Sequence, residues 1–261
     1  MSLPEPVGAV CDTFLDAAPS GLITGLYLRG GIGFGEWIAG QSDVDFVATL
    51  SRRPTHDDLD AICSAHERVS AAHPDVPFDG THLLAEDLMA DPDECPDVPC
   101  ILHRHFELEA RYDISPVTWH ELAWHGVTFA GRPLESLGIW TDRERLLDFT
   151  RANLDSYWRG NAEALAAQPN EGAREEACCW WVLGVARLDH LLVTGDMTTK
   201  SGAGRWGLTH YPEQFHRVLR EALRIREGGC DEYPDDDESR GRDTAAFTAY
   251  VVEQGGGRLE V

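Results

Sequence analysis

Two aspartates separated by one residue, Asp43 and Asp45, follow a glycine-rich stretch and open an apolar run. Side chains at positions i and i+2 of a strand point to the same side. We therefore expect both carboxylates to project together where the strand begins. Paired carboxylates suit a divalent metal ion, and the main-chain N–H groups of a glycine turn suit a phosphate. The pattern predicts metal-assisted phosphate chemistry; the alternative is an ordinary hairpin with solvated aspartates.

The flanking segments predict the elements that hold these aspartates. Residues 22–29 and 46–50 are each typical of a buried strand. Between them, the glycines of segment 30–35 predict a tight turn whose N–H groups can face an anion. The predicted order is strand, glycine turn, short spacer and Asp-x-Asp on a strand.

A third acidic residue, Asp79, lies in a further predicted strand, residues 76–84. A two-metal phosphoryl-transfer site requires a third carboxylate beyond an Asp-x-Asp pair. We expect Asp43, Asp45 and Asp79 to converge as ligands of two Mg²⁺ ions. The alternative is an acidic turn residue, because Asp79-Gly80 is also a favourable turn pair.

The composition changes near residue 140, which predicts two domains. Residues 1–140 alternate predicted strands and helices, and residues 141–261 are mostly helical. The predicted fold class is α+β, with a mixed sheet flanked by helices followed by an α-helical bundle. Helices of the second part are expected at residues 141–158, 175–193, 212–225 and 244–253. The acidic segments 85–100 and 231–243 are expected to be loops.

The net charge and the distribution of apolar residues narrow the range of possible binding partners and cellular locations. The formal net charge of −23 opposes binding to nucleic acid and favours cationic partners, although a general acidic bias tied to salt or solubility would also explain it. No stretch approaches the ~20 apolar residues of a membrane span. The first six residues lack the features of a signal peptide. We expect a cytoplasmic protein without a membrane partner; the oligomeric state is not indicated.

Seven scattered cysteines are interpreted as reduced packing residues. Cys95 and Cys100 lie close to His103 and His105, but the spacing is loose for a zinc site. We interpret that segment as a loop entering a strand, with zinc as the alternative.

The glycine turn and the aspartates together resemble a known signature. Gly30-Gly31, Gly35 and the run 42–45 are similar to the glycine–serine…Asp-x-Asp signature of the polymerase-β-like nucleotidyltransferase superfamily. The second half resembles the helical domain of the streptomycin/spectinomycin adenylyltransferases. This resemblance rests on Val182–Leu188, Leu192–Gly195, Thr199–Ser201, Ala203–Trp206 and Tyr211–Phe215. It covers the first strand pair and roughly residues 140–227, and implies a polymerase-β-like nucleotidyltransferase domain followed by a helical domain.

The resemblance implies an Mg²⁺-dependent adenylyltransferase with ATP as co-substrate. AMP would be transferred to a hydroxyl of a small cationic acceptor, an aminoglycoside-like antibiotic, which confers resistance. Asp79 falls where that family has a catalytic glutamate, the base for the acceptor hydroxyl. ATP and drug are expected in a cleft between the domains. The alternatives are transfer to another antibiotic, a metabolite, a protein or a tRNA end, and a degenerate nucleotide-binding protein without activity.

The same resemblance implies further nucleotide-binding residues. Gly30, Gly31 and Ser42 would bind the triphosphate from the glycine turn, and Arg187 and Lys200 would reach its phosphates from the helical domain. Gly31 replaces the serine of the family signature, so one hydroxyl contact is missing. From the residues alone, Arg187 interrupts an apolar helix and requires an anionic partner, with Asp189 as the alternative to a ligand. Lys200 is expected in an exposed glycine-rich loop, residues 198–207.

Substrate-binding residues are likewise implied in the second half. Trp158 falls where the family places an indole against streptomycin, although a tryptophan is more often a core residue. Glu163, Glu175 and Glu176 are candidates for binding the cations of the drug. Asp79 is one methylene shorter than the family glutamate, so both a metal-ligand role and a base role are open for it.

Overall fold

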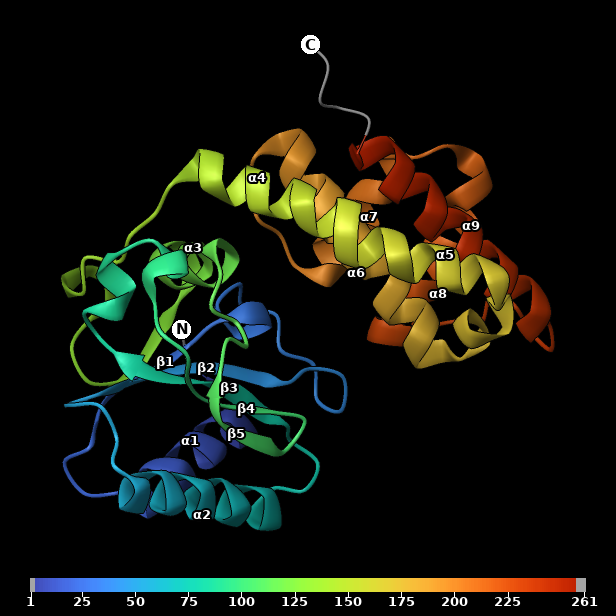
Figure 1. Ribbon diagram of the computed structural model, residues 1–261. Coiled ribbons are helices and arrows are strands. Elements are labelled where there is room, and N and C mark those ends of the chain that lie inside the picture. Colours follow the sequence, from blue (N-terminus) through green and yellow to red (C-terminus); the bar gives the residue numbers. More distant parts are fainter. Residues whose placement is uncertain (1–2, 257–261) are drawn as a thin grey trace. The chain divides into compact units, whose positions relative to one another are not determined.

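The computed structural model describes residues 3–256 and divides into two compact units, residues 1–142 and residues 143–261. The first unit contains a mixed sheet with helices, and the second is helical (Figure 1). The α+β fold class expected from the sequence is therefore confirmed.

The first unit is built on a six-stranded sheet with the order β5-β4-β3-β2-β1-β6. Its strands are β1 (Ile23–Leu28), β2 (Val44–Leu50), β3 (Phe78–Leu84), β4 (Val98–Leu102), β5 (His105–Ala110) and β6 (Val127–Ala130). The pair β2 and β3 is parallel, and the other neighbouring pairs are antiparallel. Because β1 runs against β2, its end and the glycine turn that follows lie beside the beginnings of β2 and β3.

Helices cover both faces of this sheet. Helices α1 (Glu5–Ala17) and α2 (His56–Ala72) pack on one face, where Phe14 of α1 contacts Phe46 and Phe78 (Figure 1). Helix α3 (Pro116–His125) lies on the other face and buries its apolar side chains with those of Tyr27, Val47 and Leu83. Since side chains alternate along a strand, Asp45 shares the α3 face with Val47.

The second unit consists of helices around one apolar core. They are α4 (Arg143–Asn153), the π-helical turn η5 (Leu154–Trp158), α5 (Arg159–Ala167), α6 (Glu175–Thr194), α7 (Lys200–His210), α8 (His216–Glu227) and α9 (Asp237–Gly256). Helix α6 packs against α7, α8 and α9. By length and mean hydropathy, 1.2 over its best 18-residue window, α6 meets the criteria for a membrane span, contrary to the expectation that no stretch does. Half of that window is buried inside the unit, which is typical of a core helix.

Several predicted loops are ordered elements instead. The loop prediction for residues 85–100 was wrong from residue 98 onward, where β4 begins and forms a hairpin with β5. The predicted acidic loop 231–243 ends earlier, because α9 starts at residue 237. The helix predicted for residues 141–158 starts at residue 143 and continues through η5 into α5.

The glycine-rich loop predicted for residues 198–207 was also wrong, since residues 200–210 form α7. The hydroxyl of Thr199 caps this helix by accepting a hydrogen bond from the N–H of Gly202 at 2.9 Å. Glycine lowers helix propensity, but packing overrides it here. A Cβ at Gly204 would lie 2.8 Å from side chains of both Leu183 and Leu223, so the glycine permits close packing of α7.

Candidate functional site

Asp45 and Asp79 lie side by side at the beginnings of β2 and β3. The two residues are direct partners in the parallel register of these strands. Asp43 immediately precedes β2 and is exposed, whereas Asp79 is only 2% exposed. The predicted neighbourhood of Asp45 and Asp79 is therefore present in the fold.

The buried carboxylate of Asp79 has a raised pKa. Burial is the main cause, and the charges of Asp43 and Asp45 raise it further, while His103 opposes the shift. The Nδ1 atom of His103 lies 3.8 Å from Oδ2 of Asp79. The other oxygen, Oδ1, is buried and accepts no hydrogen bond within residues 3–256. A buried oxygen without a partner is costly, so Asp79 is suited to an external ligand such as a cation.

The glycine turn is shaped around Asp45. Gly30 has φ +59°, a left-handed conformation that favours glycine. A Cβ at Gly30 would lie 2.2 Å from Oδ2 of Asp45, so the main chain approaches this carboxylate more closely than a side chain would permit. A Cβ at Gly31 would lie 2.4 Å from the carbonyl oxygen of Glu36. The serine of the family signature would therefore not fit at position 31 without a shift of this loop.

Ser42 closes the segment between the glycine turn and β2. Its hydroxyl accepts a hydrogen bond from the N–H of Ile38 at 3.1 Å, and its own N–H donates to the carbonyl of Ile38 at 2.9 Å. These bonds fix the chain just before Asp43 and Asp45.

An arginine that sequence reasoning did not single out, Arg29, lies beside Asp45. Arg29 is 7% exposed; its Nη1 donates to Oε2 of Glu121 at 2.8 Å, and its Nη2 forms ion pairs with Asp113 and, at 3.7 Å, with Oδ1 of Asp45. Its main-chain N–H donates to the carbonyl of Asp45 at 3.0 Å. Burial alone would lower the pKa of Arg29, but the charges of Asp45 and Glu121 outweigh it and raise the pKa, so the guanidinium stays charged.

The phenol of Tyr112 is influenced by the charges of the same aspartates and of Arg29. Burial raises the pKa of its phenol, and the charges of Asp45, Asp79 and Asp43 raise it further, while Arg29 opposes the shift. The phenol therefore stays protonated and can donate a hydrogen bond near the aspartates.

The residues present fit a divalent ion that is shared with a phosphate ligand. Within residues 3–256, no three histidine, cysteine, aspartate or glutamate side chains are gathered closely enough to form a metal site by themselves. The expected convergence of three carboxylates is thus not preformed, and neither is a zinc site at Cys95 and Cys100. Mg²⁺ usually binds through one or two carboxylates, with substrate phosphates and waters completing its shell. The adjacent Asp45 and Asp79, with the unpartnered oxygen of Asp79, meet that requirement.

In the second unit, Arg187 lies half-buried on α6. It makes no hydrogen bond or ion pair with any residue in the described range 3–256. The alternative partner, Asp189, is fully buried and accepts a hydrogen bond from the hydroxyl of Tyr211 at 2.8 Å. Residues i and i+2 of a helix point to different sides, which explains why Asp189 does not pair with Arg187.

The comparisons with known proteins bear on both units. Residues 150–254 match the family described as "Aminoglycoside adenylyltransferase, C-terminal domain". The resemblance drawn from the sequence is confirmed in this respect. No curated protein matches the chain significantly.

A solved structure shares the fold of this chain. It is the spectinomycin adenyltransferase AAD(9) from Enterococcus faecialis with ATP and spectinomycin, with a TM-score of 0.64 and 12% sequence identity. The match covers 94% of this chain and 98% of that one. At this identity the likeness concerns the fold alone.

The structure also shows the surroundings of Trp158 and Lys200, two other residues predicted in the second unit. Trp158 is 7% exposed and belongs to the core: its ring packs over Gly184, where a Cβ would lie 2.7 Å from it. It stacks on Trp180 with a centroid distance of 4.8 Å, and Trp180 is 39% exposed. Lys200 is half-buried at the first position of α7 rather than in an exposed loop.

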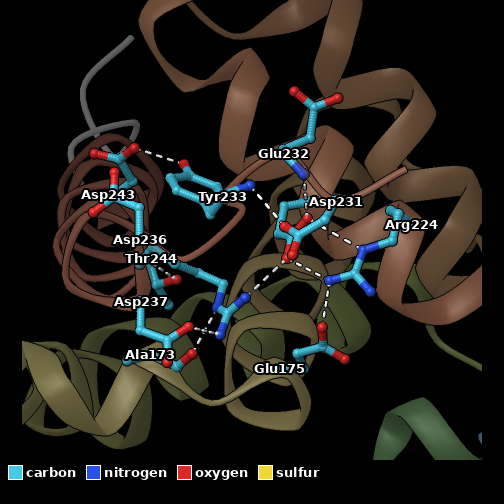
Figure 2. A network of polar contacts seen from close by, with 12 residues as sticks. Ala173, Glu175, Arg224, Asp231, Glu232, Tyr233, Asp236, Asp237, Asp243 and Thr244 are labelled. Carbon is cyan, nitrogen blue, oxygen red and sulfur yellow. Dashed lines mark hydrogen bonds and ion pairs between the residues drawn. The ribbon is translucent and has the colours of Figure 1, made fainter. Parts of the chain in front are cut away.

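The three predicted glutamates differ in their surroundings. Glu163 on α5 and Glu176 on α6 are exposed. Glu175 accepts a hydrogen bond from Nη2 of Arg224 at 2.5 Å, as Figure 2 shows. Arg224 also donates to the fully buried Glu221 at 2.6 Å, so Glu175 already takes part in a charge network of the domain.

Sequence reasoning did not connect five residues with the aspartates: Arg29, His103, Tyr112, Asp113 and Glu121. It considered His103 only as part of a possible zinc cluster. Arg29 ends an apolar strand segment, and a charged residue there was the one available signal. Glu121 lies 92 positions from Arg29, so no local pattern connects them. His103 comes from the hairpin that the sequence did not predict, and Tyr112 from the segment after it.

Proposed function

We propose that the chain is an Mg²⁺-dependent nucleotidyltransferase that transfers AMP from ATP to a hydroxyl of a small cationic acceptor, an aminoglycoside-like antibiotic. The observation that carries this proposal is the pairing of Asp45 with Asp79 in the register of β2 and β3, with a buried oxygen of Asp79 lacking a partner. The family of residues 150–254 and the fold shared with a spectinomycin adenyltransferase support the choice of reaction.

The first unit supplies the groups for phosphoryl chemistry. Asp43 and Asp45 would hold the metal ion, with Asp79 as a further ligand or as the base for the acceptor hydroxyl. When bound, Mg²⁺ neutralises charge on the triphosphate as pyrophosphate leaves. The main-chain turn at Gly30 and Gly31 offers N–H groups to phosphate oxygens. The acceptor oxygen attacks the α-phosphorus, its proton passes to a base, and pyrophosphate departs.

The second unit supplies binding groups. The guanidinium of Arg187 has no partner within residues 3–256, which suits a role in binding nucleotide phosphates, and Lys200 is proposed for the same role. Glu163 and Glu176 are exposed carboxylates that can attract a cationic acceptor, helped by the net charge of −23. Glu175 is a weaker candidate, because Arg224 already pairs with it.

A pyrophosphate-release screen tests the proposal. The full chain is incubated with Mg²⁺ and ATP or GTP over a panel of hydroxylated antibiotics, some cationic and some neutral, and products are analysed by mass spectrometry. We expect ATP-dependent pyrophosphate release with a cationic aminoglycoside-like acceptor that gains the mass of AMP. Release without acceptor modification, or no release with any member of the panel, would contradict the proposed reaction.

A further inference from the structure

We propose that Arg29 is a positioning residue for the metal site: its guanidinium holds the carboxylate of Asp45 in the orientation that binds the divalent ion. This inference rests on the proposed function, because it assumes that Asp45 is a metal ligand. It names a residue outside the glycine–serine…Asp-x-Asp pattern.

Arg29 is tied to both the main chain and the side chain of Asp45. Its N–H donates to the Asp45 carbonyl at 3.0 Å, which extends the β1–β2 pairing beyond the last residue of β1. Its Nη2 lies 3.7 Å from Oδ1 of Asp45. The opposite oxygen, Oδ2, would lie 2.2 Å from a Cβ at Gly30, so it lies against the main chain of the glycine turn. The carboxylate is thus held between a cation on one side and the glycine turn on the other.

The guanidinium itself is held in place by two carboxylates from the α3 side of the sheet. Glu121 of α3 accepts from Nη1 at 2.8 Å and is 3% exposed. Asp113 pairs with Nη2 and has φ +59°, a conformation that is uncommon for residues other than glycine. Strained backbone of this kind persists where the surrounding structure requires it, and it gathers at functional sites. Arg29 therefore joins α3 and the segment before it to Asp45.

A guanidinium fork is suited to this task because it presents donors in several directions at once, whereas a lysine ammonium is a compact charge on a flexible stem. Partners that orient a metal ligand typically change metal affinity 10–100-fold when they are lost. Arg29→Lys keeps the positive charge but removes the fork of donors. The variant therefore tests whether the guanidinium orients the Asp45 carboxylate, apart from the effect of its charge.

The test uses Mn²⁺ in place of Mg²⁺. Binding of Mn²⁺ to the full chain, in the presence of a non-hydrolysable ATP analogue, is measured by electron paramagnetic resonance. We expect Arg29→Lys to weaken Mn²⁺ binding about tenfold or more. Circular dichroism should show an unchanged fold, and saturation should be recovered at high Mn²⁺. Asp113→Asn, which tolerates the same backbone conformation, should weaken binding in the same direction.

Arg53→Lys is the matched control. Arg53 pairs with Asp87 at 2.5 Å, and both follow the far ends of β2 and β3, so this change also removes an arginine fork from the first unit. It should leave Mn²⁺ affinity unchanged.

The outcomes separate the inference from the proposed function. Unchanged or tighter Mn²⁺ binding in Arg29→Lys, together with lost binding in Asp45→Asn, would overturn the positioning role and leave the proposed function in place. Equal Mn²⁺ binding in wild type and Asp45→Asn, or none in wild type, would contradict the proposed metal site and the inference with it.

Discussion

At the scale of single residues, Gly30 sets the distance between the glycine turn and Asp45. An alanine at position 30 would be strained at φ +59°, which costs about 1–2 kcal/mol, and its Cβ would collide with Oδ2 of Asp45. We expect Gly30→Ala to lower both stability and Mn²⁺–nucleotide affinity. Gly21→Ala is the control, because Gly21 has φ +71° and open space around it. If thermal unfolding and Mn²⁺ titration show equal effects for the two variants, the close approach at Gly30 has no role in binding.

The sequence predicted the positions of the aspartates on neighbouring strands, but it did not predict the side chains that contact them. The i, i+2 spacing of Asp43 and Asp45 and the strand prediction around Asp79 were enough to place acidic side chains on neighbouring strands. The contacts of Arg29 with Glu121 depend on how α3 packs against the sheet, which no local pattern encodes. A single buried arginine is thus visible in a sequence, but its partners are not.

At the scale of elements, α7 depends on its cap and on close packing. The segment 198–207 contains several glycines, which lower its helix propensity, and contacts with α6 and α8 offset this in the fold. The β4–β5 hairpin was missed for a similar reason: its two-residue turn, His103 and Arg104, has positive φ at both positions without a glycine. Turn patterns that rely on glycine or asparagine do not find such a hairpin.

The N-cap of α7 gives a prediction at this scale. Thr199→Ala removes the acceptor for the N–H of Gly202, so we expect the second unit to lose about 1 kcal/mol of unfolding free energy. Thr209→Ala, near the other end of α7, is the control, since its hydroxyl donates only to an exposed carbonyl at 2.9 Å. Urea unfolding followed by circular dichroism measures both variants. Equal stability of Thr199→Ala and wild type would contradict the capping role.

At the scale of the whole molecule, a buried histidine pair makes stability depend on pH. His66 and His82 are 2% and 0% exposed, and their Nε2 atoms lie 3.1 Å apart. Burial lowers the pKa of His82 to about 4 and that of His66 well below its usual value. Both are therefore neutral in the folded chain near pH 6, whereas in the unfolded chain they take up protons as the pH falls through about 6.5.

The sign of the effect follows from this difference. Because the unfolded chain binds more protons, the unfolding free energy falls as pH decreases from about 6.5 toward 4, by up to about 1.4 kcal/mol per pH unit for each histidine. Denaturant unfolding between pH 7.5 and 5 measures the slope. His66→Gln should make it shallower even if it also lowers stability at neutral pH. A flat profile for wild type would contradict the buried neutral pair.

The most direct measurement of the central claim compares AMP transfer by wild type and Asp43→Asn, with Mg²⁺, ATP and the acceptor found in the screen. Asp43 is exposed, so its substitution should leave the fold intact. Asp60→Asn, at an exposed position on α2, makes the same charge change away from the aspartates. We predict that Asp43→Asn loses transfer by more than about 100-fold while Asp60→Asn keeps it, because a metal ligand matters more than the residues that support one. Transfer that survives in Asp43→Asn at the wild-type rate would contradict nucleotidyl transfer at this pair of strands.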